Sequence, residues 1–308
     1  MRRVGAALVV IAALATASGS AAPPTPRIFY AAVGSNLQYP NEPPTLQYLA
    51  DLFSVRPDGS HRRRLTRTRA WEDQPTWSPD GRRLAFTRGS PVCHAATCAG
   101  SNDTSLWTAY ASGAPPRRLT HPPDGYADSA PAWSPDGRSL AFIRMSPTDD
   151  SPVDGIYLVD AAGRTLRRLT QARPLASRLF WSPDGRTIAA GRDLVDARTG
   201  EVSRADARAR LGLPSPDRKL IAYAHAGAVY VAPVAEGGAP KRLAAAELVS
   251  GIAWSPDGRR IAFAGWRTPL RSRNAYSPPT ALYVVGVDGR GLRRLTPPGA
   301  QAYSPSWR

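Results

Sequence analysis

The chain of 308 residues carries 40 Lys and Arg side chains against 24 Asp and Glu, which gives a formal net charge of +16. A hydrophobic content of 42%, with 26 Gly and 31 Pro, is typical of a globular protein and excludes a disordered or collagen-like chain. The length suits two ordinary domains or one large all-β domain, and the placement of the hydrophobic residues excludes a multi-pass membrane protein. The positive charge raises the question of nucleic-acid binding.

The start of the chain has the layout of a secretory signal peptide. Two Arg residues precede an apolar run from about Val4 to Ala15, and small residues follow. The run is too short to span a bilayer about 30 Å thick, although an uncleaved anchor is the alternative. Cleavage after Ala17 or nearby fits best. We expect residues 1–22 to be a signal peptide and the protein to be exported, periplasmic or extracellular, with no membrane span after cleavage.

Two cysteines, Cys93 and Cys98, lie in the loop-like stretch SPVCHAATCAG. Four intervening residues allow their Cα atoms to approach disulfide distance, and disulfides persist in exported proteins. A metal site would need three or four ligands, and only His94 lies nearby in the sequence. We therefore expect a loop disulfide, with free thiols and then a metal site as the alternatives.

One sequence pattern recurs along the rest of the chain, as in repeat proteins. Its first half, WSPDGRRLAF and variants, has its Trp position at Trp77, Trp133, Trp181, Pro214 in a degenerate copy, Trp254 and Trp307. Its second half resembles LYVVDxxGxxxRRLT, and the copies are Asp51–Thr66, Ser105–Thr120, Gly155–Thr170, Asp193–Arg204, Ala228–Ala244 and Ala281–Thr296.

Each copy predicts four short strands. The first strand ends at the Trp, and SPDG predicts a tight turn, because Pro presets φ and Gly accepts a left-handed conformation. RRLAF alternates charged and apolar residues, as a half-buried strand does. LYVVD is the third strand and RRLT the fourth. Such four-stranded units, without helical periodicity between them, indicate a β-propeller.

The two ends of the repeat region complement each other. The chain ends at Trp307-Arg308 in a first strand without partners, and Pro26–Val33 is a second strand without its first. Joined to Asp51–Thr66, they make one blade that closes the ring and leaves no unpaired inner edge. We predict an all-β fold, a six-bladed β-propeller of four-stranded blades with a split closing blade, filling residues 23–308 as a single domain. Five or seven blades are the alternatives.

These repeats resemble the TolB-type, WD-repeat-like propeller family, whose signature is PxWSPDG(K/R)xIAF…LYVxDxxGxxxRRLT. The resemblance covers about residues 26–308 and rests on a long string that recurs. It implies the propeller fold. TolB also has a separate N-terminal domain, for which the residues before Pro26 leave no room. We therefore carry over the fold rather than membership of the Tol envelope system.

Residues that occupy the same position in every copy are expected to be structural. We interpret the Trp at the end of the first strand as an aromatic that packs between blades. The Asp of SPDG is interpreted as a turn former rather than a calcium ligand or catalytic carboxylate. The structural tryptophans are Trp77, Trp133, Trp181, Trp254 and Trp307.

All long insertions between repeats are predicted to emerge on one face of the propeller, opposite the SPDG turns; we call it the long-loop face. Binding residues concentrate on loops held by a rigid scaffold, and exposed aromatics near Arg are common binding anchors. The alternative is that these side chains pack within their own loops. The candidate binding residues on this face are Tyr39, Trp71, Tyr126, Trp266, Arg267, Arg271, Arg273 and Tyr276.

Signatures of catalysis are scarce, since the chain contains neither H-E-x-x-H nor G-x-S-x-G and its four His residues are scattered. We expect no cofactor and no metal site. The leading hypothesis is an exported, monomeric, non-enzymatic scaffold that binds a protein, peptide or glycan on the long-loop face. The alternative is a propeller hydrolase or lyase acting on polysaccharide or peptide, with candidate groups Glu72, Asp73, His121 and Asp128.

The repeat itself accounts for much of the positive charge. Of the 40 cations, 19 stand just after the SPDG turns or just before the fourth-strand Leu, so they are spread around the ring. Nucleic-acid binding needs a coherent basic stripe, so we do not expect it. The cluster of Arg267, Arg271 and Arg273 remains and favours an acidic partner.

Overall fold

The structure is a computed structural model that describes most of the chain after the predicted signal peptide. The described residues are 26–34, 50–68, 70–90, 93–94, 97–98, 103–111, 115–146, 152–171, 176, 178–182, 184–204, 212–217, 219–234, 238–266, 280–298 and 300–308. Within them, no helix is long and apolar enough to cross a membrane. The signal peptide prediction, residues 1–22, lies outside the described residues.

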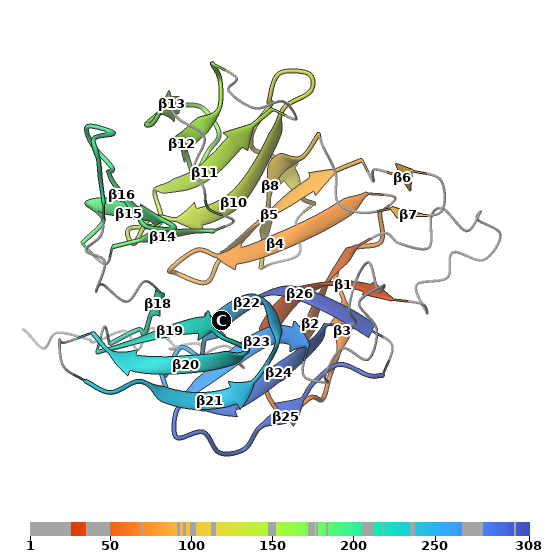
Figure 1. Ribbon diagram of the computed structural model, residues 1–308. Helices are drawn as coiled ribbons and strands as arrows, with labels where there is room; N and C mark the ends of the chain where they lie inside the picture. The colour runs from red at the N-terminus through yellow and green to blue at the C-terminus, as the bar shows by residue number, and fades with distance from the viewer. Residues whose placement is uncertain are drawn as a thin grey trace, which may run out of the picture.

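Six antiparallel four-stranded sheets form the blades of a propeller (Figure 1). The innermost strands of blades 1 to 5 are β4 (Trp71–Trp77), β10 (Ala127–Trp133), β14 (Leu179–Trp181), β18 (Leu213–Pro214) and β22 (Leu248–Trp254). The second strands are β5 (Arg83–Gly89), β11 (Ser139–Met145), β15 (Thr187–Ala190), β19 (Leu220–His225) and β23 (Arg260–Trp266). The prediction of a six-bladed, all-β propeller is confirmed.

The outer strands repeat in the same order. The third strands are β8 (Ser105–Tyr110), β12 (Gly155–Asp160), β16 (Asp193–Asp196), β20 (Ala228–Pro233) and β24 (Ala281–Gly286). The fourth strands are β9 (Arg117–Arg118), β13 (Leu166–Arg168), β17 (Val202–Arg204), β21 (Lys241–Ala245) and β25 (Arg293–Arg294). A separate two-stranded hairpin, β6 (Cys93–His94) with β7 (Thr97–Cys98), lies between the second and third strands of blade 1 in the chain.

The split blade closes the ring from both ends of the described chain. Its strands run in the order β26 (Ala300–Trp307), β1 (Ile28–Gly34), β2 (Asp51–Val55) and β3 (Arg63–Arg64). Ile28 pairs with Trp307, and the amides of Arg27 and Arg308 each donate to the other's carbonyl at 2.9 Å. The predicted closure is confirmed, and it leaves β1 paired on both sides.

The SPDG segments form turns with a repeated hydrogen-bond pattern. In blade 1 the Ser78 hydroxyl donates to Asp80 Oδ1 at 2.5 Å, and the Arg82 amide donates to the same oxygen at 3.0 Å. Gly81 takes the left-handed φ of 64° that the turn requires. The hydrogen bond from Ser78 lowers the pKa of Asp80. The other SPD turns repeat these contacts with Asp136, Asp184, Asp217 and Asp257.

The Thr that ends RRLT also has a structural role. Its hydroxyl accepts a hydrogen bond from the backbone N–H of a third-strand residue, as from Leu52 to Thr66 at 2.9 Å. The Arg two residues earlier donates through Nε to the Thr carbonyl, at 3.0 Å for Arg64. Thr120, Thr170 and Thr296 accept the same bond from the third strands of blades 1, 2 and 5. The motif thus attaches the short outer strand to its blade in the split blade and in blades 1, 2 and 5.

Three of the repeated tryptophans join neighbouring blades around the centre through hydrogen bonds. The indole N–H of Trp133 donates to the Thr76 carbonyl of the preceding innermost strand, at 3.2 Å. Trp181 and Trp254 make the same bond to the carbonyls of Ala132 and Leu213, at 3.0 and 2.7 Å. These contacts support the interpretation of the repeated Trp as a blade-packing residue.

Candidate binding site in the central channel

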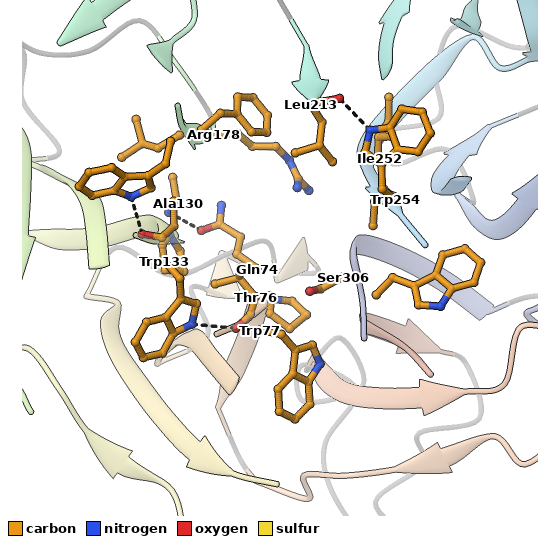
Figure 2. Close-up of a pocket in the computed structure, with 18 of the residues that line it drawn as sticks. Gln74, Thr76, Trp77, Ala130, Trp133, Arg178, Leu213, Ile252, Trp254 and Ser306 are labelled. Atoms are coloured by element: carbon orange, nitrogen blue, oxygen red, sulfur yellow. Dashed lines mark hydrogen bonds between the residues drawn. The ribbon is translucent and has the colours of Figure 1, made fainter. Parts of the chain in front are cut away.

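The innermost strands surround a cavity of about 380 Å³ in the centre of the propeller (Figure 2). The repeated tryptophans, the SPDG prolines Pro79 and Pro135, and the residues that precede each Trp line it. The tryptophans thus have a second role that their repetition did not predict, since they pack between blades and also form the channel wall. Its lining tryptophans are Trp77, Trp133, Trp181, Trp254 and Trp307.

The innermost strands bulge two to four residues before the Trp. The register of β4, β10 and β22 against their partner strands shifts there, and β26 shifts against β1 at the same level. Gln74, Ala130 and Ser304 hold φ values of 54°, 53° and 46°, a left-handed conformation that costs free energy for residues other than Gly. Gln74 Oε1 accepts the Ala130 amide at 2.6 Å, which ties blades 1 and 2 together. Strained backbone of this kind is concentrated at functional sites.

Arg178 occupies the corresponding position in blade 3. Its side chain extends across the cavity toward the strand of blade 5 (Figure 2), where Nη2 donates to the Ser250 carbonyl at 2.9 Å. A Cβ built on Gly251 would collide with Nη2, so the absence of a side chain at Gly251 makes room for the guanidinium. Burial lowers the Arg178 pKa, and the charge of Asp73 opposes that shift.

Asp73 brings the opposite charge to the channel from blade 1. Its Oδ1 accepts the Gln74 amide at 2.6 Å, and the Ser304 side chain also hydrogen-bonds to it. Burial raises the Asp73 pKa, while these hydrogen bonds and the charge of Arg178 act in the opposite direction. Residues from blades 1, 3, 5 and the split blade thus meet in one partly buried polar cluster, which we call the channel cluster: Asp73, Gln74, Arg178, Ser250 and Ser304.

A second cavity, of about 460 Å³, adjoins the first between blades 3, 4 and 5. The walls of both cavities include Arg178, Phe180, Leu213 and Ile252. The rest of the second wall includes Gly191 in the turn after β15, Ala224 near the end of β19 and Val249 near the start of β22. These positions lie at the long-loop ends of their strands, so this cavity extends from Arg178 toward the long-loop face.

Three of the predicted long-loop residues, Trp71, Tyr126 and Trp266, lie among the described residues. Trp71 is the first residue of β4 and Trp266 the last of β23, so both lie at strand ends rather than within insertions. Tyr126, just before β10, is half-buried. None of these three lines the two cavities described above. The remaining candidates, Tyr39, Arg267, Arg271, Arg273 and Tyr276, lie outside the described residues.

Two of the candidate catalytic carboxylates are held in buried ion pairs. Asp128 accepts two hydrogen bonds from Arg144, at 2.6 and 2.8 Å, and both side chains are less than 5% exposed. Glu72 pairs with Arg88 at 2.7 Å in the equivalent position of blade 1. Asp128 therefore stabilises a buried guanidinium, and Glu72 stabilises one that is partly buried. His121 is exposed, and Asp73 belongs to the channel cluster.

The two cysteines lie in a short hairpin, and no metal site is found among the described residues. Cys93 and Cys98 pair directly opposite each other in the β6–β7 ladder, and the disulfide between them stays a prediction. Within the described part of the chain, no three His, Cys, Asp or Glu residues gather in a group that could hold a metal ion.

Comparison with known proteins gives sequence relatives for parts of the chain. No family model matches. An uncharacterized peptidase, YuxL of Bacillus subtilis, is 29% identical over 225 residues, which cover 68% of this chain and 31% of that protein. The Tol-Pal system protein TolB 1 of Novosphingobium aromaticivorans is 40% identical over 82 residues, 26% of this chain and 15% of that protein. The matches thus span less than a third of the length of these relatives.

Solved structures match over nearly the whole chain. TolB from Acinetobacter baumannii has a TM-score of 0.67 at 20% identity, over 91% of this chain and 66% of that one. A structure ascribed to TolB from Agrobacterium tumefaciens has a TM-score of 0.53 at 17% identity, over 92% of this chain and 99% of that one. At these identities the likeness shows the fold alone. The predicted resemblance is confirmed at that level, since the chain has the same β-propeller fold as these structures.

Proposed function

We propose that this chain is an exported, non-enzymatic binding protein that takes a protein, peptide or glycan ligand at the long-loop end of its central channel. The observation that carries this proposal is the pair of adjoining cavities that share Arg178, Phe180, Leu213 and Ile252. Concave sites with mostly apolar walls and a few convergent polar groups are typical ligand sites.

Blades 3 and 4 have short loops and short innermost strands, which leave space for the second cavity. Their second and third strands are joined by the short turns Gly191–Arg192 and Ala226–Gly227, whereas the other blades carry long insertions there. Their innermost strands are also short, with three residues in β14 and two in β18 against seven in β4, β10 and β22. The cavity therefore lies where the blades contribute least chain to the long-loop face.

A hydrolase or lyase acting on polysaccharide or peptide is the second candidate function. The name of the Bacillus peptidase favours it, but the match covers only 31% of that protein. The ion pairs of Glu72 with Arg88 and of Asp128 with Arg144 count against it, because a paired, buried carboxylate is poorly suited to acid–base chemistry. Hydrolysis or elimination products from a peptide and polysaccharide panel would support this second function.

A pair of neighbouring substitutions tests the binding proposal. Ala224 is exposed and lines the second cavity, so Ala224→Trp should fill the mouth and abolish binding of any ligand found by screening peptides and glycans against the protein. His225→Trp adds the same side chain one residue along β19, where it does not line the cavity, and should leave binding intact. Equal affinity of the two variants, measured by calorimetry, would contradict this site.

Export and oligomeric state belong to the same proposal. Expression of the full chain should yield a periplasmic or secreted form that lacks the first residues, as N-terminal sequencing would detect. The chain should elute as a monomer in size-exclusion chromatography.

A further inference from the structure

Most hydrogen-bond donors of Arg178 have no partner among the described residues. A guanidinium has five N–H donors, and within the described residues its one hydrogen bond is from Nη2 to the Ser250 carbonyl, at 2.9 Å. The side chain forms part of the wall of both cavities. The described sequence positions equivalent to Arg178 are uncharged in the other blades: Gln74, Ala130, Gly251 and Ser304. Arg178 therefore puts one cation, with free donors, at the junction of the two cavities.

Among the described residues, no carboxylate forms a direct ion pair with Arg178. Asp73 is the one anion whose charge acts on Arg178 among the described residues, and it is already bonded to the Gln74 amide and the Ser304 side chain. A planar guanidinium with free donors matches a carboxylate, which it can bind through two parallel hydrogen bonds. Because Asp73 lies in the same cluster, a singly charged anion suits the site better than a doubly charged phosphate.

The walls beside Arg178 determine what the carboxylate would be attached to. Phe180, Leu213, Val249 and Ile252 present apolar surface to the second cavity. The hydroxyl groups of a sugar acid would lose hydrogen bonds to water against such walls. An aliphatic or aromatic side chain would gain free energy from burial there.

From these contacts we propose that Arg178 binds the C-terminal carboxylate of a peptide whose last residue has an apolar side chain, with that side chain in the second cavity. This inference rests on the proposed function and narrows it to one ligand class. Gly251 contributes by leaving room for the guanidinium, and the Ser250 carbonyl holds it in place.

The probe that tests the ligand class is acetyl-Ala-Ala-Leu with a free carboxylate, against the same peptide with a C-terminal amide. Binding is measured by calorimetry and by the fluorescence of the channel tryptophans. We expect the free acid to bind at least tenfold more tightly than the amide. The competing ligand classes are tested with glucuronate, with acids that have the leucine side chain but no peptide bond, and with inorganic phosphate. Tighter binding of any of these, or no binding of the free acid, would overturn the proposal.

Substitutions in the channel cluster test the role of Arg178. Arg178→Gln should weaken binding of the free acid at least tenfold and leave the amide unchanged. Asp73→Asn removes the competing anion and should strengthen binding of the free acid several-fold, a gain that misfolding cannot produce. Arg186→Gln, an exposed Arg beside the SPDG turn of blade 3, is the control and should have no effect. Unchanged affinity in both channel variants would refute a carboxylate site at Arg178.

The two proposals fail in different ways. A ligand that Ala224→Trp blocks but that binds Arg178→Gln normally would refute the carboxylate site and leave the binding function standing. A ligand that neither variant affects would refute the channel as the site of binding altogether.

Discussion

The two ends of the propeller differ in how closely they follow the repeat. On the SPDG face, five turns share the same Ser–Asp and Asp–backbone hydrogen bonds. Inside the channel, the position three residues before the Trp holds a different side chain in each described copy. Contacts that repeat in every blade stabilise the propeller fold. Positions whose side chain differs between blades are therefore the ones that can give this chain a specific function. Arg178 is the departure with the largest change in charge.

The largest expected effect comes from removing the closing strand. Deletion of residues 304–308 takes away the pairs of Ser306 and Trp307 with β1 and the hydrogen bonds between Arg27 and Arg308, together with the buried Pro305 and Trp307. Lost burial and hydrogen bonds should lower the free energy of unfolding by about 5 kcal/mol or more. Thermal unfolding followed by circular dichroism measures this loss.

Trp307→Phe is the matched control for that deletion. The indole nitrogen of Trp307 has no hydrogen-bond partner among the described residues, so this change should cost only about 1 kcal/mol through lost packing. A truncated protein that melts like the full chain would show that the ring does not depend on the split blade.

A second prediction breaks a contact that only some blades have. Asp128→Ala leaves Arg144 buried without its partner, at a cost of about 3–5 kcal/mol in the free energy of unfolding. The double variant Asp128→Leu with Arg144→Met removes both charges and should recover most of that loss. Urea denaturation of the two variants gives the comparison. Equal destabilisation would mean that the pair itself, rather than the unpaired cation, carries the stability.

The sequence predicted the blades well because their signals are local. Pro and Gly in SPDG, the alternation of RRLAF and the unpaired first strand at Trp307 each act within a few residues. The channel cluster was not predictable in this way, since Asp73, Arg178 and Gly251 meet only after blades 1, 3 and 5 are in place. The bulge that carries Gln74 was also hidden, because a left-handed φ was expected at Gly and occurs here at Gln, Ala and Ser.

On the long-loop face, too, the sequence did not determine where the side chains lie. Trp71 and Trp266 were assigned to the long-loop face because they stand outside the repeated positions, and they lie at the long-loop ends of β4 and β23 without lining either cavity. A departure from the repeat in sequence therefore marks a difference between blades without giving the place of the side chain. Arg178 occupies a position that every copy of the repeat contains, but it is the charged residue among the described copies. This difference in charge is the sequence signal that could have identified it.

The third prediction concerns pH at the junction of the split blade and blade 1. Burial raises the pKa of Asp51 from 3.8 to about 6, with Arg64 lowering it and Glu72 raising it. The native state thus holds a proton that the unfolded state has lost between about pH 4 and 6. Stability should therefore fall as the pH rises through this window, by up to about 3 kcal/mol from this group.

Asp51→Asn isolates that contribution. Asp73 and Asp128 also have raised pKa values, so the informative quantity is the difference between the wild type and the variant. Urea denaturation at pH 4.5 and pH 7 should show a smaller loss of stability with rising pH in Asp51→Asn than in the wild type. The same pH dependence in both proteins would mean that Asp51 titrates normally.

The smallest effect is expected at the SPDG turns. It tests whether turns with the same hydrogen bonds contribute equally to the free energy of unfolding. Asp80→Ala and Asp136→Ala each remove an acceptor for one Ser hydroxyl and one backbone amide, on a mostly exposed side chain. Each should cost about 1 kcal/mol. Because the contacts repeat, the two losses should agree within about 0.5 kcal/mol and add in the double variant, since independent sites are additive. Unequal or non-additive losses in thermal unfolding would mean that the blades differ on this face too, and that charge at the channel is not the main departure from the repeat.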